Sequence, residues 1–466
     1  MAESLLTRVS VEGGRAIPDA ATGEIIGHAP EQTVADLERA IEVARAAQPA
    51  WAALSSGERG AALHAAAAKV EEYAEELAAI VSREQGKPLS GPGARLEVGG
   101  AVGWLHTNAD LEIEPQVLVD DAENYSELIY KPVGLVGAIG PWNWPMMIMV
   151  WQVAPALKMG NAVIVKPSEY TPLSVLALVE VMNEALPAGV LQVVSGGREV
   201  GAALAAHEAF GKIMFTGSTR TGRAIVEASS QNLARLTLEL GGNDAGIVLP
   251  GTDVGKYTEG LFWGAFINTG QTCAALKRLY VHEDQYEEVV ANLADFASKA
   301  PMGVGLDEAN VLGPLQNQMQ FDIVKGLVED ARARGRRIVT GGEPAPELGA
   351  NFFQATIIAD AEDGDPIVDE EQFGPALPII KYTDLEDAIA SANRLDAALG
   401  ASVWGDDPAE TRRIAERLEA GTVWINKHGG VHPMVPFGGI KGSGYGLEFG
   451  VEGLKATGVP MVITSR

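Results

Sequence analysis

The sequence predicts an α/β protein whose core is a doubly wound parallel sheet. Residues from about Glu31 to His106 repeat apolar side chains with the period of packed amphipathic helices, and Gly86 supplies a stop signal within them. From Leu135 onward, short apolar runs alternate with helix-like segments, which is the pattern of βαβ units. The chain has 466 residues, 47% of them hydrophobic, and so exceeds one compact domain; two or three domains are expected.

The predicted strands of the first sheet are short apolar runs separated by helix-like stretches such as "PLSVLALVEVMNEAL". In chain order they are "LVGAI", "AVIVKP", "LQVVSG", "KIMFTGS" and "RLTLELGG". We expect helices to cover both faces of this sheet. A second alternating block extends roughly from Ala245 to Trp424, with "LKRLYVHE", "RRIVTGG" and "GTVWIN" as strand candidates. The change of pattern sets the boundary between the blocks near residues 241–242.

One segment, "QVLVDDAENYSELIYKPVG", belongs to neither block. It has two strand-like runs around an acidic turn and precedes the first predicted parallel strand. It is interpreted as an excursion used for subunit contact.

The charge balance argues against nucleic acid and membranes as partners. The 35 basic and 62 acidic residues give a net charge of −27, which repels phosphate backbones and anionic lipid surfaces. The N-terminus "MAESLLTRVS" has no export signal, and no run of about 18 apolar residues occurs. A single cysteine cannot form an intramolecular disulfide. These features together predict a cytoplasmic protein.

That single cysteine, Cys273, lies in "NTGQTCAALKRL". Metal sites usually need several thiolates or a cysteine and histidine cluster, so no metal site is expected. Two interpretations remain, an inert buried thiol or a nucleophile. The neighbours favour a nucleophile, because Gly270 would let the backbone approach a ligand and Ala274–Ala275 leave space beside the sulfur.

Two other polar residues end predicted strands of the first block. Glu239 closes "TLELGG", and partial burial there would raise its pKa toward the work of a general base. Asn143 in "GPWNWP" could donate its amide to a developing oxyanion. The alternatives are a surface glutamate at a strand end and an asparagine in a turn or helix cap.

A dinucleotide site is suggested without the usual G-x-G-x-x-G fingerprint, which is absent. In "FTGSTRTG", Gly217, Ser218 and Gly222 stand at a strand-to-helix junction whose amides could hold a pyrophosphate. In "VKPSE", Lys166 and Glu169 could hold ribose hydroxyls. Each motif also has an ordinary structural interpretation, as a helix cap or a solvated pair.

These motifs, with two later ones, resemble the aldehyde dehydrogenase superfamily in order and spacing over nearly the whole chain. The most similar branch is the hydrolytic, NAD(P)-dependent one, whose members oxidise aldehydes to carboxylates. The motifs are "PWNWP", "VKPSE", "FTGSTRTG", "LELGG", "GQTCAALKR", "EEQFGP" and "PFGGIKGSGYGLEFG".

The resemblance implies a fold of three parts and an assembly of identical subunits. Residues 1–112 and 131–241 would form the NAD-binding domain with its doubly wound sheet, and residues 242–444 the α/β catalytic domain. Residues 113–130 and 445–466 would form a small β oligomerisation hairpin, with its last strand within "ATGVPMVIT". A homodimer or homotetramer is expected.

The resemblance also implies the chemistry. Cys273 would add to the aldehyde, and Asn143 with the Cys273 N–H would stabilise the thiohemiacetal. Glu239 would activate water to hydrolyse the later thioester. NAD is the expected cofactor and NADP a weaker alternative, because Glu169 would repel a 2′-phosphate. The implied cofactor contacts are Trp142, Lys166, Ser168, Glu169, Gly217, Ser218, Leu240, Glu371 and Phe373.

The implied walls of the aldehyde tunnel carry no charge. With no carboxylate or arginine among them, we expect apolar aliphatic or aromatic aldehydes as substrates. Gly429–Gly430 suggests a roomy entrance, which His428 and His432 would border as surface or packing residues. Two rival interpretations are an enzyme that acylates coenzyme A and a non-catalytic relative that kept the fold. The tunnel residues are Met147, Ile148, Trp151, Ile267 and Val431.

Overall fold

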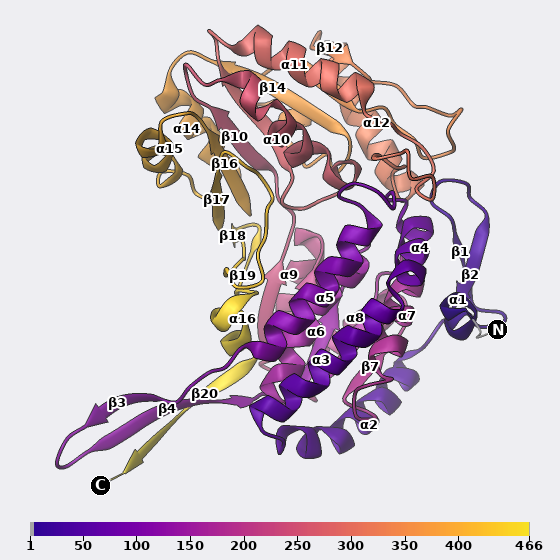
Figure 1. Ribbon diagram of the computed structural model, residues 1–466, viewed down its shortest axis with the longest axis vertical. Helices are drawn as coiled ribbons and strands as arrows, with labels where there is room; N and C mark the ends of the chain where they lie inside the picture. The colour runs from indigo at the N-terminus through magenta and orange to yellow at the C-terminus, as the bar shows by residue number, and fades with distance from the viewer. Residues whose placement is uncertain (1–3, 466) are drawn as a thin grey trace.

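A computed structural model describes residues 4–465, and Figure 1 shows two α/β units with a slender β arm. The lower unit, indigo to magenta, contains the first half of the chain, and the upper unit, pink through orange to gold, contains most of the second half. The arm joins a purple hairpin to the yellow C-terminal strand. The predicted α/β fold class is confirmed.

The sheet of the lower unit has the strand order β19-β9-β8-β5-β6-β7. Its strands β5 to β9 pair in parallel, and β19 adds antiparallel to the β9 edge. The bounds are β5 Leu135–Ile139, β6 Ala162–Lys166, β7 Leu191–Val193, β8 Phe210–Thr216, β9 Arg235–Glu239 and β19 Gly444–Tyr445. The apolar runs that predicted β5 to β9 therefore correspond to observed strands.

Helices cover both faces of this sheet because each apolar strand points alternate residues to opposite sides. Val136 and Val163 pack in one core with α3 to α7, whereas Leu135 and Ile164 pack in another with α2, α8 and α9. The helices are α2 Val34–Ala52, α3 Ser56–Glu72, α4 Ala74–Gln85, α5 Ala94–Asp110, α6 Pro145–Met159, α7 Pro172–Met182, α8 Arg198–Ala206 and α9 Thr219–Ser229.

Strand β5 is the switch point of the lower sheet, since it pairs with β6 on one side and β8 on the other. Ile139 stands opposite both Lys166 and Phe215, and Thr216 stands opposite Glu239. The carboxyl ends of these strands therefore meet at one edge. In doubly wound sheets this edge is where ligands bind.

The upper unit contains the sheet β12-β13-β14-β11-β10-β16-β17, and its described strand pairs are parallel except β12 with β13. The strands are β10 Asp244–Val248, β11 Leu276–His282, β12 Arg337–Thr340, β13 Thr356–Ala361, β14 Ala376–Tyr382, β16 Gly400–Trp404 and β17 Thr422–Ile425. Its helices are α10 Val254–Phe266, α11 Tyr286–Lys299, α12 Gln318–Ala333, α13 Pro366–Asp369, α14 Leu385–Asn393 and α15 Pro408–Ala415. Two apolar cores lie on its two faces.

The arm is a sheet of order β20-β4-β3, made of β3 Gln116–Asp120, β4 Tyr125–Pro132 and β20 Gly458–Ser465. Its strands extend beyond the rest of the protein (Figure 1) and leave Val117, Leu118 and Val462 about half exposed. The segment that fitted neither block is therefore a hairpin closed by a distant strand. The predicted domain limits stay a prediction.

Short elements complete the chain. They are α1 Leu5–Val9, β1 Arg15–Pro18, β2 Ile25–Ala29, the 3₁₀ turn η1 Ile267–Gly270, β15 Ala397–Ala398, β18 Ile440–Lys441 and α16 Gly450–Ala456. Among residues 4–465, no helix combines the length and apolarity needed to cross a membrane.

Candidate functional site

The loop before Cys273 has a backbone that most residues avoid. Asn268 and Gly270 have φ values of 51° and 75°, and the Lys277 ammonium donates to the carbonyls of Gly270 (2.6 Å) and Gly374 (3.2 Å). A Cβ on Gly270 would lie 2.1 Å from the Gly374 oxygen. The expectation that this glycine lets the backbone approach a ligand is therefore corrected, because its close neighbour is another backbone carbonyl.

The Cys273 thiol is partly buried in an acidic neighbourhood. Burial raises its pKa above the ordinary range, and Glu371, Glu239 and Asp244 raise it further, while the Ala274 amide opposes them weakly. The thiol therefore keeps its proton until a base accepts it. Amides and cations around the sulfur do not outweigh these effects.

Asn143 is buried beside the cysteine loop and is tied to it. Its side-chain nitrogen donates to the Gln271 carbonyl (2.9 Å), and its own carbonyl accepts from the Asn268 side chain (2.9 Å). Next to it, the Trp144 indole donates to the Thr272 hydroxyl (2.9 Å). Because an amide nitrogen has two hydrogens, one N–H of Asn143 holds the loop and the other can serve a ligand.

Glu239 ends β9, is 4% exposed, and has no hydrogen-bond partner on either carboxyl oxygen within the described chain. Burial raises its pKa well above the ordinary value, and a second carboxyl group, Glu448, adds to the rise. Glu448 is equally buried, and no partner for its oxygens is found among residues 4–465. Burial raises the pKa of Glu448 to about 8, although Lys212 lowers it. The negative charge of either carboxylate therefore makes ionisation of the other less favourable.

Glu448 is not among the site residues predicted from the sequence. It stands between two apolar residues in "GLEFG", far from Glu239 in the chain. The only sign of its role in the sequence is that one charged residue lies between apolar residues typical of a buried core.

A cavity of about 450 Å³ lies at the carboxyl edge of the lower sheet, between the two units. It brings Asn143 and Cys273 together with most of the predicted cofactor contacts. Those contacts are Trp142, Ser168, Gly217, Ser218, Leu240, Glu371 and Phe373.

The N-terminus of α9 opens into this cavity. The Ser218 hydroxyl caps the helix by accepting from the Thr221 amide (3.3 Å), and the remaining first-turn amides have no partners inside the helix. A Cβ on Gly222 would lie 2.6 Å from the Leu240 side chain. The glycine is thus needed for helix packing, and the helix terminus is suited to an anion.

Glu169 lines a second cavity of about 730 Å³, whereas Lys166 lines neither of the two. The buried Lys166 ammonium donates to the Pro167 carbonyl (3.0 Å), and burial lowers its pKa, against the opposing effect of Glu169. Arg15 lies 3.7 Å from the Glu169 carboxylate. This arginine, which the sequence argument missed, partly offsets the negative charge there. Tyr170 lines both cavities, so they adjoin.

Glu371 and Phe373 form another part of the wall of the 450 Å³ cavity. The Glu371 carboxyl accepts from the Gly242 amide (3.2 Å), and burial raises its pKa to about 8. A Cβ on Gly241 would lie 2.6 Å from a Glu371 oxygen, so a larger residue there would displace the Glu371 carboxyl. The Phe373 ring stands edge-on to Trp142, with centroids 5.3 Å apart.

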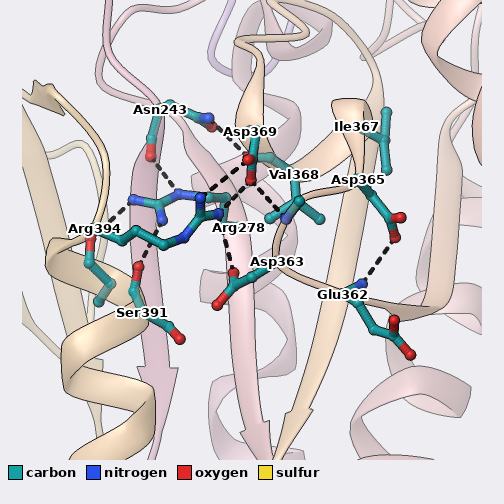
Figure 2. Close-up of polar contacts among 12 residues, drawn as sticks. Asn243, Arg278, Glu362, Asp363, Asp365, Ile367, Val368, Asp369, Ser391 and Arg394 are labelled. Carbon is teal, nitrogen blue, oxygen red and sulfur yellow. Dashed lines mark hydrogen bonds and ion pairs between the residues drawn. The ribbon is translucent and has the colours of Figure 1, made fainter.

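A polar network behind the cavity fixes this wall (Figure 2). Arg278, near the start of β11, donates to the Asn243 carbonyl (2.9 Å), and the Asn243 amide donates to the Val368 carbonyl (2.9 Å). Arg394 pairs with Asp369 at the end of α13 (3.0 Å). The network therefore ties together the chain segments that follow Glu239, follow Cys273 and precede Glu371.

None of the predicted tunnel residues lines the cavity that contains Cys273. Met147, Ile267 and Val431 are partly buried and pack against the same apolar core as Cys273. They do not line the 450 Å³ cavity, so any tunnel would approach the sulfur from a different direction.

The other two tunnel residues are more deeply placed. Ile148 is 1% exposed and belongs to the core. The Trp151 ring packs edge-on against Phe449 (4.8 Å) and at 5.5 Å from Trp104. Trp104 and Phe449 are aromatic neighbours that the sequence argument did not identify.

The two histidines differ. His428 is a buried packing residue, with Nδ1 2.8 Å from the Ser402 hydroxyl and Nε2 3.5 Å from the Asp244 carboxylate. His432 is exposed and accepts from the Met434 amide (3.2 Å).

Known proteins share this architecture. The chain is 37% identical over 449 residues to a phenylacetaldehyde dehydrogenase of Pseudomonas fluorescens, covering 93% of this chain and 89% of the relative. A NAD+ complex of an aldehyde dehydrogenase from Bacillus cereus superposes with a TM-score of 0.93 at 33% identity, covering 97% and 92% of the two chains. An NADP-dependent enzyme of E. coli gives 0.94 at 34% identity, covering 98% and 96%.

The match extends to the family level. The model of the aldehyde dehydrogenase family matches residues 12–459, nearly the whole chain. This chain belongs to the aldehyde dehydrogenase family of oxidoreductases.

Proposed function

We propose that this protein oxidises an apolar aldehyde to a carboxylic acid, with NAD as cofactor, through covalent intermediates on Cys273. One observation supports the proposal most. The thiol of Cys273, the amide of Asn143 and the wall residue Glu371 line one cavity at the carboxyl edge of a doubly wound sheet, and the buried base candidate Glu239 ends the adjoining strand.

In the first step, the Cys273 sulfur bonds to the aldehyde carbon and the thiol proton passes to a base. The carbonyl oxygen becomes an oxyanion, and the free N–H of Asn143 with the backbone N–H of Cys273 would donate to it. Because Asn143 stays tethered to Gln271, its donor is preorganised and pays no reorganisation cost.

The cavity suits a dinucleotide. The amides at the start of α9 and Ser218 would hold the pyrophosphate, Lys166 and Glu169 the adenosine ribose, and Glu371 the nicotinamide ribose. Phe373 and Trp142 offer flat apolar surfaces for the nicotinamide ring. When bound, NAD supplies the acceptor for the hydride that leaves the aldehyde carbon.

Oxidation leaves a thioester on Cys273, and Glu239 would act in its hydrolysis. Glu239 takes a proton from water, the water oxygen attacks the thioester carbonyl, and the carbon–sulfur bond breaks to release the acid. Burial makes this carboxylate a stronger base than usual, in keeping with this role. A route to coenzyme A thioesters would not need such a base.

The apolar character of Met147, Ile267 and Val431, with the aromatic neighbours of Trp151, favours an aliphatic or aromatic aldehyde. The phenylacetaldehyde dehydrogenase similar to this chain supports an aromatic substrate. We expect phenylacetaldehyde and medium-chain alkanals to give the highest kcat/KM in a panel that includes charged aldehydes.

Glu239→Gln tests the hydrolytic mechanism. We expect a burst of NADH approaching one per active site, followed by turnover lowered by about 10²–10⁴-fold, because deacylation loses its base. A share of Glu239 in deprotonating the thiol would shrink the burst but leave the acyl group on Cys273. Mass spectrometry should find the acyl group on Cys273. Cys273→Ala is the control, with neither burst nor acylation but retained NAD binding. Wild-type turnover in Glu239→Gln, or a requirement for coenzyme A in the parent enzyme, contradicts the mechanism.

Glu448→Gln tests the carboxyl pair. Glu239 accepts a proton only when ionised, so deacylation rises as pH rises through its pKa. Removing Glu448 removes a group that raises this pKa, and the rising limb should move to lower pH. Rapid-quench mass spectrometry of acyl-enzyme decay against pH measures the limb. Glu452→Gln, a surface change nearby, should leave it in place, and an unmoved limb in Glu448→Gln would show that the carboxyls act independently.

Glu169→Gln tests cofactor choice. Loss of the charge that repels a 2′-phosphate should raise the NADP/NAD ratio of kcat/KM on the order of tenfold, the value of one screened charge contact. Glu31→Gln is the matched control, since Glu31 also lies beside Arg15 (3.6 Å). Equal ratios in the two variants would exclude a special role for Glu169.

We also propose that the arm joins identical subunits. Val117, Leu118 and Val462 would otherwise leave apolar surface in water. Val462→Glu should shift light-scattering mass toward smaller species, whereas Val462→Ile should keep the parent mass. A monomeric parent protein rules this out.

A further inference from the structure

An ion pair with no exposed surface lies behind the Asn143 loop. The side chains of Lys87 and Glu97 are both 0% exposed, with Nζ 2.5 Å from Oε2. Burial lowers the pKa of Lys87 to about 8, and Glu97 opposes this effect. Buried charges are tolerated only when their remaining hydrogen-bonding capacity is used, so the other contacts of the pair are informative.

Those contacts all go to one segment. The Lys87 ammonium donates to the Asn143 carbonyl (2.8 Å) and lies 3.5 Å above the Trp144 ring. The second Glu97 oxygen accepts from the amides of Met146 (2.8 Å) and Met147 (3.3 Å). These amides belong to the first turn of α6, where helix donors lack partners and a carboxylate is stabilised by the helix dipole.

The segment held in this way contains two functional parts. At its start, Asn143 presents the donor for the oxyanion, and an oxyanion donor works only within hydrogen-bond reach. At its end, Met147 borders the apolar region beside Cys273. The Met147 sulfur is also confined from the other side, because a Cβ on Gly100 would lie 2.6 Å from it.

We propose that Lys87 and Glu97 are positioning residues for aldehyde oxidation. Lys87 sets the height of the Asn143 amide over Cys273, and Glu97 sets the start of α6 and with it Met147. This inference rests on the proposed function. Neither residue touches the reacting atoms, so both act through the residues that they hold.

The chain offers a matched control in Lys158. Its side chain is also buried (1% exposed), and it donates to the carbonyls of Ser56 (3.0 Å) and Ala109 (2.8 Å) and pairs with Glu112 (3.0 Å). These partners lie near the base of the arm. Lys158→Met therefore removes a comparable buried cation without touching the Asn143 loop.

The first experiment compares Lys87→Met with Lys158→Met. In Lys87→Met the rate of NADH formation in the first turnover with phenylacetaldehyde (the burst rate) should fall about 10–100-fold, the size of a misplaced donor. NAD affinity should stay within about twofold, since Lys87 and Glu97 bond to Asn143, Met146 and Met147 and to none of the predicted cofactor contacts. Alkylation of Cys273 by iodoacetamide should keep its rate, because that reaction forms no oxyanion. Lys158→Met should lower Tm but keep the burst rate.

The second experiment separates positioning from stability. Replacing both partners, in Lys87→Met/Glu97→Leu, removes the unpaired charge, so Tm should recover relative to either single variant. The burst rate should stay low, because the Asn143 carbonyl keeps only its bond from Asn268 and the α6 amides lose their carboxylate. A burst rate that recovers with Tm, or a loss in Lys87→Met no larger than in Lys158→Met, overturns the positioning role. A parent enzyme that forms no NADH from any aldehyde overturns the proposed function as well.

Discussion

The site depends on the register of four parallel strands. Because β5, β6, β8 and β9 pair so that Ile139, Lys166, Thr216 and Glu239 fall at one edge, the loops that follow them converge on one cavity. A slip of one residue in any pairing would exchange the side chains packed against the two helix layers and move the polar residue that ends the strand. Packing on both faces of the sheet therefore fixes the distances between the side chains of the candidate site.

Much of this fold could be predicted because the strands are short apolar runs that contrast with their surroundings. "LVGAI" and "AVIVKP" are strands for the reason the sequence suggests, since both faces are buried. The strands of the upper sheet have weaker signals in the sequence. β13 and β14 lie among loops whose course depends on tertiary contacts, and β19 has only Gly444 and Tyr445, too few residues for a local pattern.

The residues of the candidate site also differ in how well the sequence predicts them. Cys273, Asn143 and Glu239 carry local signals, a unique thiol and polar residues at strand ends. Lys87 and Glu97 carry none and Glu448 only its place between two apolar residues, because a charged residue in a sequence is usually solvated and only distant packing removes its water. Residue type thus predicts which side chains can react. It does not predict the buried residues that shift the pKa of those side chains or hold them in position.

The contact between residues 443–445 and the end of β9 has a consequence for the order in which the parts of the molecule fold. The Ser443 hydroxyl donates to the Gly241 carbonyl across 202 residues of sequence, and Gly444 pairs with Glu239. At ordinary rates of translation these partners are made about 10–40 s apart. During that interval the edge of β9 in a nascent chain stays open to water at Glu239, the proposed general base, so the dehydrated environment of this residue forms late in biosynthesis.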